Sequence, residues 1–266
     1  MKDKKLKAAL ITGGSKGIGY ELAKLAADDG YNPVLVSRSE DELIEVKDEL
    51  EDDFGVNGKV IPGDLSEEET PERIYKELQK TNYRVDLLIN NAGRGQMGDF
   101  TVTDWETDKE MMHLNMDAVI HLTKLFLPGM KERSSGKILN VSSLAAFQPG
   151  PLMALYYATK AFVQSFSEAL AEEVADEGIT VTALSPGPVD TDFQVSGEMP
   201  GSSDDSGNTY ELEPARVAKE GYQGLMNGKR IAVPGTFISI APQLTRFLPR
   251  SSVTKFVKKM NEIQLS

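Results

Sequence analysis

A glycine-rich turn near the N-terminus constrains the fold of this chain more than any other feature. Residues 8–12 form a short apolar run with β-branched members, which is typical of a buried strand. Thr12, Gly13, Gly17 and Gly19 then form the pattern T-G-x-x-x-G-x-G, and apolar residues recur at helical spacing as far as Ala26. Glycines allow a backbone to approach a pyrophosphate, and a helix N-terminus offers N–H groups to it. This context favours a nucleotide-binding βα unit over an ordinary βα turn.

The residues that follow the second apolar run, 33–36, bear on which dinucleotide would bind. In NAD-binding βαβ units an acidic residue at this place holds the ribose hydroxyls, whereas an arginine accommodates the 2′-phosphate of NADP. Here Ser37 and Arg38 follow the run, and Lys16 adds a second cation from the glycine turn. Two cations without an acid favour NADP(H). The alternative is that Arg38 pairs with Glu42 on a helix surface, an interaction worth under about 1 kcal/mol.

Apolar runs continue to alternate with helical patterns along the chain. Five more strands are expected at residues 59–62, 85–90, 137–141, 179–184 and 230–233, and the longer helical patterns cover 104–133, 161–177 and 213–227. The run 85–90 is apolar without period-two alternation, as in a strand buried on both faces of a parallel sheet. With neither an internal repeat nor a linker, we expect one α/β domain over residues 1–266.

A tyrosine and a lysine stand four residues apart where a helix is expected to begin. This spacing places Tyr156 and Lys160 on one helix face. An adjacent ammonium favours a phenolate, so we expect Lys160 to lower the pKa of Tyr156, as a general acid or base requires. Ser142 and Ser143 follow the expected strand 137–141 and would reach the same edge of the sheet, where open α/β sheets bind ligands. A surface tyrosine beside a solvated lysine is the alternative.

Composition excludes several classes of function. The net charge of −12 argues against a nucleic-acid partner, because phosphates would be repelled. The chain has no cysteine, which excludes disulfides, thiolate catalysis and cysteine metal sites. His113 and His121 lie eight residues apart without a further ligand at metal-binding spacing, so we expect no metal site. No apolar window reaches the length of a membrane span, and we expect a cytoplasmic protein.

Two segments near the C-terminus stand outside this pattern. Residues 193–213 lose apolar periodicity and are rich in Gly, Ser and Asp, and we expect a lid or a disordered insert there. The tail, residues 237–266, mixes Phe and Val with Lys and Arg, which makes it a basic amphipathic end on an acidic chain. We expect this tail to pack against the body or a partner subunit. Weak adhesion to a membrane surface is the less favoured alternative.

Together, these motifs resemble those of the short-chain dehydrogenase/reductase family, in its compact single-domain branch, over nearly all of the chain. The matching positions are the glycine turn 12–19, N-N-A-G at 90–93, Asn115, Ser143, Y-x-x-x-K at 156–160 and P-G-x-V-x-T at 186–191. Ser143 is preferred over Ser142 because the family's serine lies thirteen residues before the tyrosine. Ala145 replaces a glycine that the family often has two residues after the serine.

The resemblance implies a fold, a coenzyme and a reaction. The fold is a three-layer doubly wound Rossmann fold with a seven-stranded parallel sheet. The reaction is NADP(H)-dependent reduction of a ketone or 3-oxoacyl-like carbonyl to an alcohol, with Tyr156 as general acid. Ser143 would polarise the carbonyl, Lys160 would hold the nicotinamide ribose and Asn115 would position a water. The implied coenzyme-binding residues are Gly13, Ser15, Lys16, Gly17, Ile18, Gly19, Ser37, Arg38, Asp64, Leu65, Asn91, Ala92, Gly93, Tyr156, Lys160, Pro186, Gly187, Val189 and Thr191.

Substrate and assembly are less constrained by the resemblance. Phe147, Met153 and Phe193 are candidate pocket walls, apolar enough to suit a hydrophobic small-molecule substrate. The helices around Asn115 and after Tyr156 form the subunit contact in many relatives, which implies a homodimer or homotetramer. A non-catalytic NADP(H)-binding regulatory or scaffold protein is the alternative. A serine hydrolase is disfavoured, because there is no G-x-S-x-G motif and both histidines precede Ser143.

Overall fold

The computed structural model describes residues 5–189, 195–196, 212–235 and 248–264. Its main sheet has seven parallel strands in the order β3-β2-β1-β4-β6-β7-β9. These are β1 (Leu6–Thr12), β2 (Asn32–Val36), β3 (Lys59–Val60), β4 (Tyr83–Asn90), β6 (Gly136–Val141), β7 (Ile179–Leu184) and β9 (Ile231–Ala232). The strand order reverses between β1 and β4, and doubly wound sheets bind ligands at such a switch point. The predicted fold class is confirmed.

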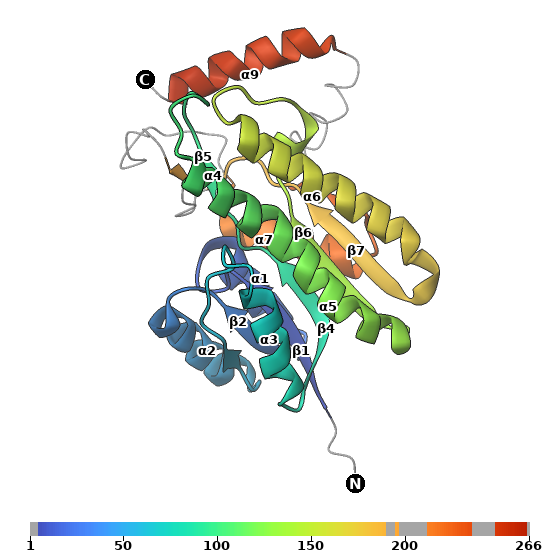
Figure 1. Cartoon of the computed structure of the whole chain (residues 1–266). Coiled ribbons are helices and arrows are strands. Elements are labelled where there is room, and N and C mark those ends of the chain that lie inside the picture. The colour runs from blue at the N-terminus through green and yellow to red at the C-terminus, as the bar shows by residue number, and fades with distance from the viewer. Residues whose placement is uncertain (1–4, 190–194, 197–211, 236–247, 265–266) are drawn as a thin grey trace.

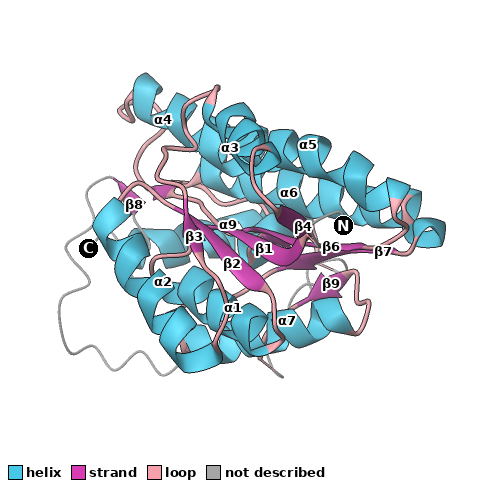
Figure 2. Cartoon of the chain, turned by 90° about the horizontal axis from the view of Figure 1, so that it is seen from below, coloured by secondary structure: helices cyan, strands magenta, loops and turns pink. Residues whose placement is uncertain are grey.

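Helices cover both faces of the sheet and give three layers (Figures 1 and 2). One face packs against α1 (Gly17–Asp28), α2 (Glu40–Phe54) and α7 (Pro214–Met226). The other packs against α3 (Thr70–Gln79), α5 (Ala118–Glu132) and α6 (Ala154–Glu173). Both faces of the sheet are therefore buried, which explains why the strands read as continuous apolar runs.

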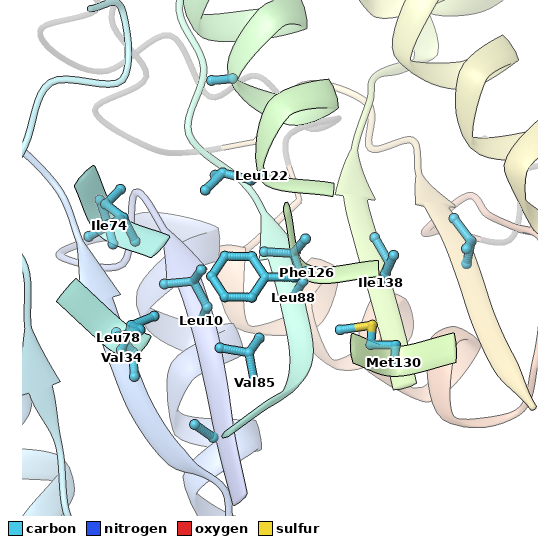
Figure 3. Close-up of a cluster of buried hydrophobic side chains, with 14 of the residues drawn as sticks. Leu10, Val34, Ile74, Leu78, Val85, Leu88, Leu122, Phe126, Met130 and Ile138 are labelled. Carbon is cyan, nitrogen blue, oxygen red and sulfur yellow. The ribbon is translucent and has the colours of Figure 1, made fainter. Parts of the chain in front are cut away.

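Successive residues of the central strands enter opposite cores. In β1, Ala8 and Leu10 join the cluster on the α3–α5–α6 side, whereas Ala9 and Ile11 join the cluster on the α1–α2–α7 side. Figure 3 shows the first cluster, in which Leu10 of β1 lies near Phe126 of α5. The two clusters fix the sheet between its helix layers and so fix the strand ends that carry the polar residues.

The helical pattern at 104–133 contains an irregularity that the sequence does not predict. It consists of α4 (Trp105–Met112), a π-helical turn His113–Asp117 and α5, without an intervening loop. The Asp104 side chain accepts a hydrogen bond from Thr107 N at 2.9 Å and caps the start of α4. π-helical turns inside α-helices are frequently found at functional sites, and this one holds Asn115.

A second, two-stranded sheet also lies outside the predicted elements. In it β5 (Gly95–Gln96) pairs in parallel with β8 (Val195–Ser196), which belongs to the predicted lid. Each strand has only two residues, too few for a periodic pattern. Most of the lid, 193–213, lies outside the described residues.

The end of the chain forms α9 (Arg250–Gln264), which packs on the body of the molecule. Val253, Val257 and Asn261 are buried, and Asn261 Nδ2 donates a hydrogen bond to Pro151 O at 2.7 Å. The rest of the predicted tail, 237–247 and 265–266, lies outside the described residues. Among the described helices, none has both the length and the apolar character needed to cross a membrane.

Candidate active site

The glycine turn and the segment 90–93 are tied together at the carboxyl ends of β1 and β4. Thr12 Oγ1 accepts hydrogen bonds from Asn91 N and Ala92 N, both at 2.9 Å. Asn91 Nδ2 donates to Thr12 O at 2.9 Å and to Gly13 O at 3.1 Å. A Cβ atom on Gly19 would lie 2.0 Å from Gly13 O, so only glycine fits there. These contacts make the turn and the end of β4 one connected floor.

A cavity of about 380 Å³ lies over this floor. Twelve of the predicted coenzyme-binding residues line it: Gly13, Ser15, Lys16, Gly17, Ile18, Ser37, Arg38, Asp64, Leu65, Asn91, Ala92 and Gly93. Eight lining residues were not predicted: Val36, Ser39, Glu42, Gly63, Ser66, Arg94, Glu110 and Leu114. Gly19 does not line the cavity, because its part is to let α1 approach Gly13.

The chemistry of the cavity wall fits a nicotinamide dinucleotide. Glycines and the N-terminus of α1 provide an uncrowded backbone surface for phosphates. Lys16 and Arg38 add positive charge. Asp64 has a local task, because its Oδ1 accepts from Ser66 N at 2.9 Å and from Ser66 Oγ at 2.6 Å. That turn presents residues 63–66 to the cavity.

Ser143, Tyr156 and Lys160 converge beyond the carboxyl end of β6. Tyr156 and Lys160 lie on the first turns of α6, and the side chain of Ser143, which follows β6, hydrogen-bonds to that of Tyr156. Lys160 is buried, and its Nζ donates to Val141 O at 3.0 Å and lies 5.9 Å from the centroid of the Tyr156 ring. Ser142 is buried, and its Oγ donates to Lys160 O at 2.9 Å. Ser143, and not Ser142, therefore reaches the tyrosine.

The expected effect of Lys160 on the acidity of Tyr156 is wrong. Burial raises the pKa of Tyr156 to about 12, and the hydrogen bond with Ser143 offsets this only in part. Burial also lowers the pKa of Lys160 to about 8. The physical reason is that Lys160 Nζ is bonded to the carbonyl of Val141, so desolvation rather than mutual attraction dominates both groups.

Asn115 connects the cavity to this group of side chains. From the π-helical turn its Oδ1 accepts from Arg94 N at 3.0 Å, while its Nδ2 donates to Arg94 O at 2.9 Å and to Thr159 Oγ1 at 3.0 Å. A Cβ atom on Gly93 would lie 3.2 Å from Asn115 Oδ1 and 3.3 Å from Lys160 Nζ. Asn115 is thus a clamp between the segment after β4 and the helix that carries Tyr156, and it faces Lys160 across Gly93.

The remaining predicted site residues lie apart from the cavity or outside the described residues. Pro186 O accepts a hydrogen bond from Leu144 N at 2.9 Å, which holds the segment with Pro186 and Gly187 beside the one that begins at Ser143. Val189 forms an isolated parallel bridge with Leu212. Phe147 is partly buried and Met153 is buried. Thr191 and Phe193 are outside the described residues.

Two features of the site were missed at the level of sequence. Arg94 Nη1 lies 2.7 Å from Glu110 Oε2, and both residues line the cavity. The position of Arg94 directly after N-N-A-G was a signal for its place, but nothing in the sequence pointed to Glu110.

The second is a buried polar chain under the site. Asn90 Nδ2 donates to Asn140 Oδ1 at 2.8 Å, and Asn140 Nδ2 donates to Ser167 Oγ at 2.9 Å. This chain links β4, β6 and α6. In the described part of the chain, no group of three or more His, Asp or Glu side chains is arranged to hold a metal ion.

The matches to known proteins extend over both halves of this arrangement. A family model described as short chain dehydrogenase matches residues 7–199, which include the glycine turn and residues 143–160. A very-long-chain 3-oxoacyl-CoA reductase of Anas platyrhynchos is 34% identical over 259 residues, which cover 96% of this chain and 80% of that protein.

Two solved structures have the same architecture. A short-chain dehydrogenase from Sphingobium yanoikuyae in complex with NADPH has a TM-score of 0.79 and 27% identity, covering 91% of this chain and 93% of that chain. A bulky-bulky ketone specific alcohol dehydrogenase from Comamonas testosteroni has a TM-score of 0.77 and 26% identity, covering 94% of both chains.

Proposed function

Because the chain belongs to the short-chain dehydrogenase/reductase family, we propose that it is an NADP(H)-dependent oxidoreductase that reduces a carbonyl group to an alcohol. Membership establishes an oxidoreductase with a nicotinamide coenzyme; the choice of NADP(H) and the direction of the reaction are our proposal. The observation that carries it is that Ser143, Tyr156 and Lys160 meet, and that Lys160 Nζ would lie 3.3 Å from a Cβ atom on Gly93, which lines the cavity together with the glycine turn. The three residues themselves do not line the cavity.

The preference for NADP(H) rests on charge. Lys16 and Arg38 line the cavity where the second strand ends, and Ser15, Ser37 and Ser39 add hydroxyl groups around them. A 2′-phosphate carries negative charge and several acceptor oxygens, which this set of donors would satisfy. Glu42 and Asp64 also line the cavity, but Asp64 is engaged by Ser66, so the preference rests on the donors that Lys16 and Arg38 offer and not on the net charge of the lining. When bound, NADPH supplies the hydride that the carbonyl carbon accepts.

Ser143 and Tyr156 would hold the carbonyl oxygen through their hydroxyl groups. With a pKa of about 12, Tyr156 is fully protonated near neutral pH and can donate its proton. The oxygen becomes an alkoxide as the carbon is reduced, and an alkoxide is a stronger base than a phenolate, so proton transfer from Tyr156 is favourable. Ser143 donates to the same oxygen and stabilises its developing charge.

Lys160 would compensate for the charge left on Tyr156. The phenolate forms in a buried place, where an ammonium 5.9 Å from the ring centroid interacts more strongly than it would in water. A pKa of about 8 lets Lys160 exchange a proton close to neutral pH and return one to the site. Asn115 supports this by holding Arg94 and Thr159, the residues that flank Gly93 and Lys160.

The substrate that we propose is an apolar ketone or a 3-oxoacyl group. Met153, which is buried, and Phe147, which is partly buried, are apolar residues of the segment between Ser143 and Tyr156 and are the candidate walls for such a substrate. The names of the relatives, a 3-oxoacyl-CoA reductase and a bulky-ketone alcohol dehydrogenase, agree with this class. We also propose a homodimer or homotetramer through α4–α5 and α6, where Phe162 is exposed and stacks on Phe166 at 6.2 Å between ring centroids.

The experiment that tests the function combines NADPH with a panel of apolar ketones and 3-oxoacyl thioesters. We expect loss of NADPH absorbance together with formation of the matching alcohol, detected by mass spectrometry. NADH is the matched control and should support slower turnover. Tight NADPH binding without alcohol formation from any member of the panel would instead favour the non-catalytic alternative.

A further inference from the structure

Helix α9 lies at one end of the molecule, beyond α4 and α6 (Figure 1). Exposed apolar side chains are concentrated on α9 and on the loop before α4. Nine large hydrophobic side chains are exposed in the described part of the chain, and seven of them belong to residues 100–105 and 248–263. These seven, which we call the apolar band, are Phe100, Val102, Trp105, Leu248, Phe256, Met260 and Ile263. Exposed hydrophobic side chains that occur singly need no explanation, whereas a concentration of them marks an interaction surface.

The two segments of the apolar band are neighbours in space. Gly98 N donates a hydrogen bond to Leu152 O at 2.8 Å, and Asn261 Nδ2 of α9 donates to the adjacent Pro151 O at 2.7 Å. Hydrogen bonds from Thr101 lower the pKa of Asp99, and the positive charge of Lys258 on α9 lowers it further. The loop before α4 and the C-terminal half of α9 therefore both bind the segment that contains Pro151 and Leu152.

Packing on the body accounts for only one side of α9. Val253, Val257 and Asn261, at spacing i, i+4 and i+8, form the buried side. Phe256, Met260 and Ile263, at spacing i, i+4 and i+7, form a separate apolar stripe, in which Phe256 and Ile263 are 65% and 66% exposed. This stripe contributes little to holding α9 in place.

Charge distinguishes α9 from the rest of the chain. It contains four basic residues, Arg250, Lys255, Lys258 and Lys259, and one acidic residue, Glu262, for a net charge of +3. Because the whole chain has a net charge of −12, the residues outside α9 carry a net charge of −15. By helical geometry Lys255 and Lys259 lie on the side of the apolar stripe away from the buried side, and both are exposed. An apolar stripe bordered by lysines is typical of helices that lie in a membrane interface.

We propose that the apolar band docks on the surface of an anionic lipid bilayer, with α9 lying in the plane of the interface. The lysines of α9 would meet anionic headgroups while Phe256, Met260 and Ile263 enter the boundary of the acyl chains. Trp105 would sit at headgroup level, where tryptophan is enriched. Residues 98–106 carry three exposed acids, Asp99, Asp104 and Glu106, so this loop would lie at the rim of the contact and the basic α9 at its centre. The rest of the acidic body would face away from the headgroups. A contact that stacks α9 on α9 of a second copy is disfavoured, since it would place two helices of charge +3 against each other. A contact of α9 with residues 98–106 of a second copy is separated from lipid binding by the sedimentation measurement below.

The test uses the full-length protein and two kinds of vesicle, phosphatidylcholine alone and phosphatidylcholine mixed with phosphatidylserine. We expect the protein to float with the phosphatidylserine vesicles, to bind the neutral vesicles much more weakly and to be released by high salt. Trp105 is the only tryptophan in the chain, so its emission should shift to shorter wavelength when the apolar band docks.

Variants of exposed residues test whether vesicle binding occurs through the apolar band. Phe256→Ser should weaken vesicle binding by about tenfold, and Lys255→Gln and Lys259→Gln by roughly fivefold each. The matched controls are Ile44→Ser, an exposed hydrophobic position on α2, and Lys80→Gln, an exposed lysine at the end of α3. Neither control should change binding.

Absence of flotation with phosphatidylserine vesicles would overturn the proposal, as would binding that Phe256→Ser and Lys255→Gln leave unchanged. If the protein does not bind the vesicles, and Phe256→Ser instead converts a larger assembly into a smaller one in sedimentation velocity, the apolar band is a contact between copies of the chain. That result also refutes a lipid partner. Each of these outcomes is independent of whether the protein turns over carbonyl substrates.

Discussion

The edge of the main sheet has a glycine-turn half, residues 12–19 and 90–93, and a tyrosine half, residues 141–160, and the two are built by different means. In the glycine-turn half, main-chain atoms and uncharged side chains form the floor, as the ties between Thr12 and Asn91 show. In the tyrosine half, burial shifts the pKa of Tyr156 upward and that of Lys160 downward, which favours the neutral form of each. The glycine-turn half should therefore respond to added volume, and the tyrosine half to protonation.

The first way to separate the two halves is Tyr156→Phe, which has the largest expected effect. Loss of the proton donor should lower kcat by roughly 10²–10⁴-fold, while NADPH still binds because the glycine-turn half is untouched and the phenyl ring is kept. Steady-state kinetics and a titration of NADPH fluorescence measure the two quantities. Turnover near the wild-type rate would remove Tyr156 from the role of general acid.

A second prediction uses the burial of Lys160 to set the pH dependence of stability. Its pKa falls from 10.5 to about 8 on folding, so between these values the unfolded chain binds more protons and the free energy of unfolding rises with pH. The gain across this window is about 3 kcal/mol. Chemical denaturation of the wild type and of Lys160→Met at both ends of the window measures it.

The Lys160→Met variant should lack this rise, whereas Lys124→Met, at an exposed position on α5, should keep it. The raised pKa of Tyr156 acts in the opposite sense, because between 10 and about 12 the folded chain retains the proton and stability falls as pH rises. An equal rise in the wild type and in Lys160→Met would contradict the burial of a neutral amine.

The third prediction tests whether the glycine-turn half depends on volume. In Gly19→Ala the new Cβ atom would lie 2.0 Å from Gly13 O, so α1 and the turn must separate. We expect a loss of about 1–3 kcal/mol in the free energy of unfolding and a large loss of NADPH affinity. Gly129→Ala on α5 is the control, because its nearest neighbour, Arg133 Nη1, is 3.4 Å away. That variant should gain up to about 1 kcal/mol from helix propensity.

The smallest effect concerns coenzyme choice within the glycine-turn half. Arg38→Asp should lower the preference for NADPH over NADH by about tenfold, since it replaces a charged donor to a phosphate by a repelling carboxylate. Competition between the two coenzymes measures the preference. Arg216→Asp, an exposed arginine on α7, should leave it unchanged. An unaltered preference in Arg38→Asp would assign the 2′-phosphate to other residues.

The same contrast explains how much of the molecule could be predicted from its sequence. The strands and the glycine turn were predictable because apolar runs, glycine spacing and helical periodicity are local properties of the chain. Twelve of the cavity residues were predicted, but the full set came from the resemblance to the family and not from those local properties alone. The ion pair between Arg94 and Glu110 was not predictable, because it depends on how α4 is placed against the segment after β4.

The pKa of Tyr156 shows the limit more sharply. The spacing correctly placed Lys160 on the same helix face as Tyr156. The effect of a neighbouring ammonium on the pKa of a tyrosine, however, also depends on burial and on the atom to which the ammonium donates its hydrogen bond. The carbonyl of Val141, which decides the matter, lies on a strand of the sheet. The strands β5 and β8 escaped prediction for a related reason, since two residues gain strand geometry only from a distant partner.

The π-helical turn at His113–Asp117 also changes how the helix around it can be read. A π turn takes up one residue more than an α turn, so it offsets the two sides by about 100°. The faces of α4 and α5 are thus rotated relative to each other about the helix axis, so one continuous helical wheel cannot describe both helices. Deleting a single residue within the π-helical turn would leave one continuous α-helix, but it would turn the side-chain amide of Asn115 away from Arg94 and Thr159. The placement of one side chain is in this way encoded by a residue count rather than by a residue type.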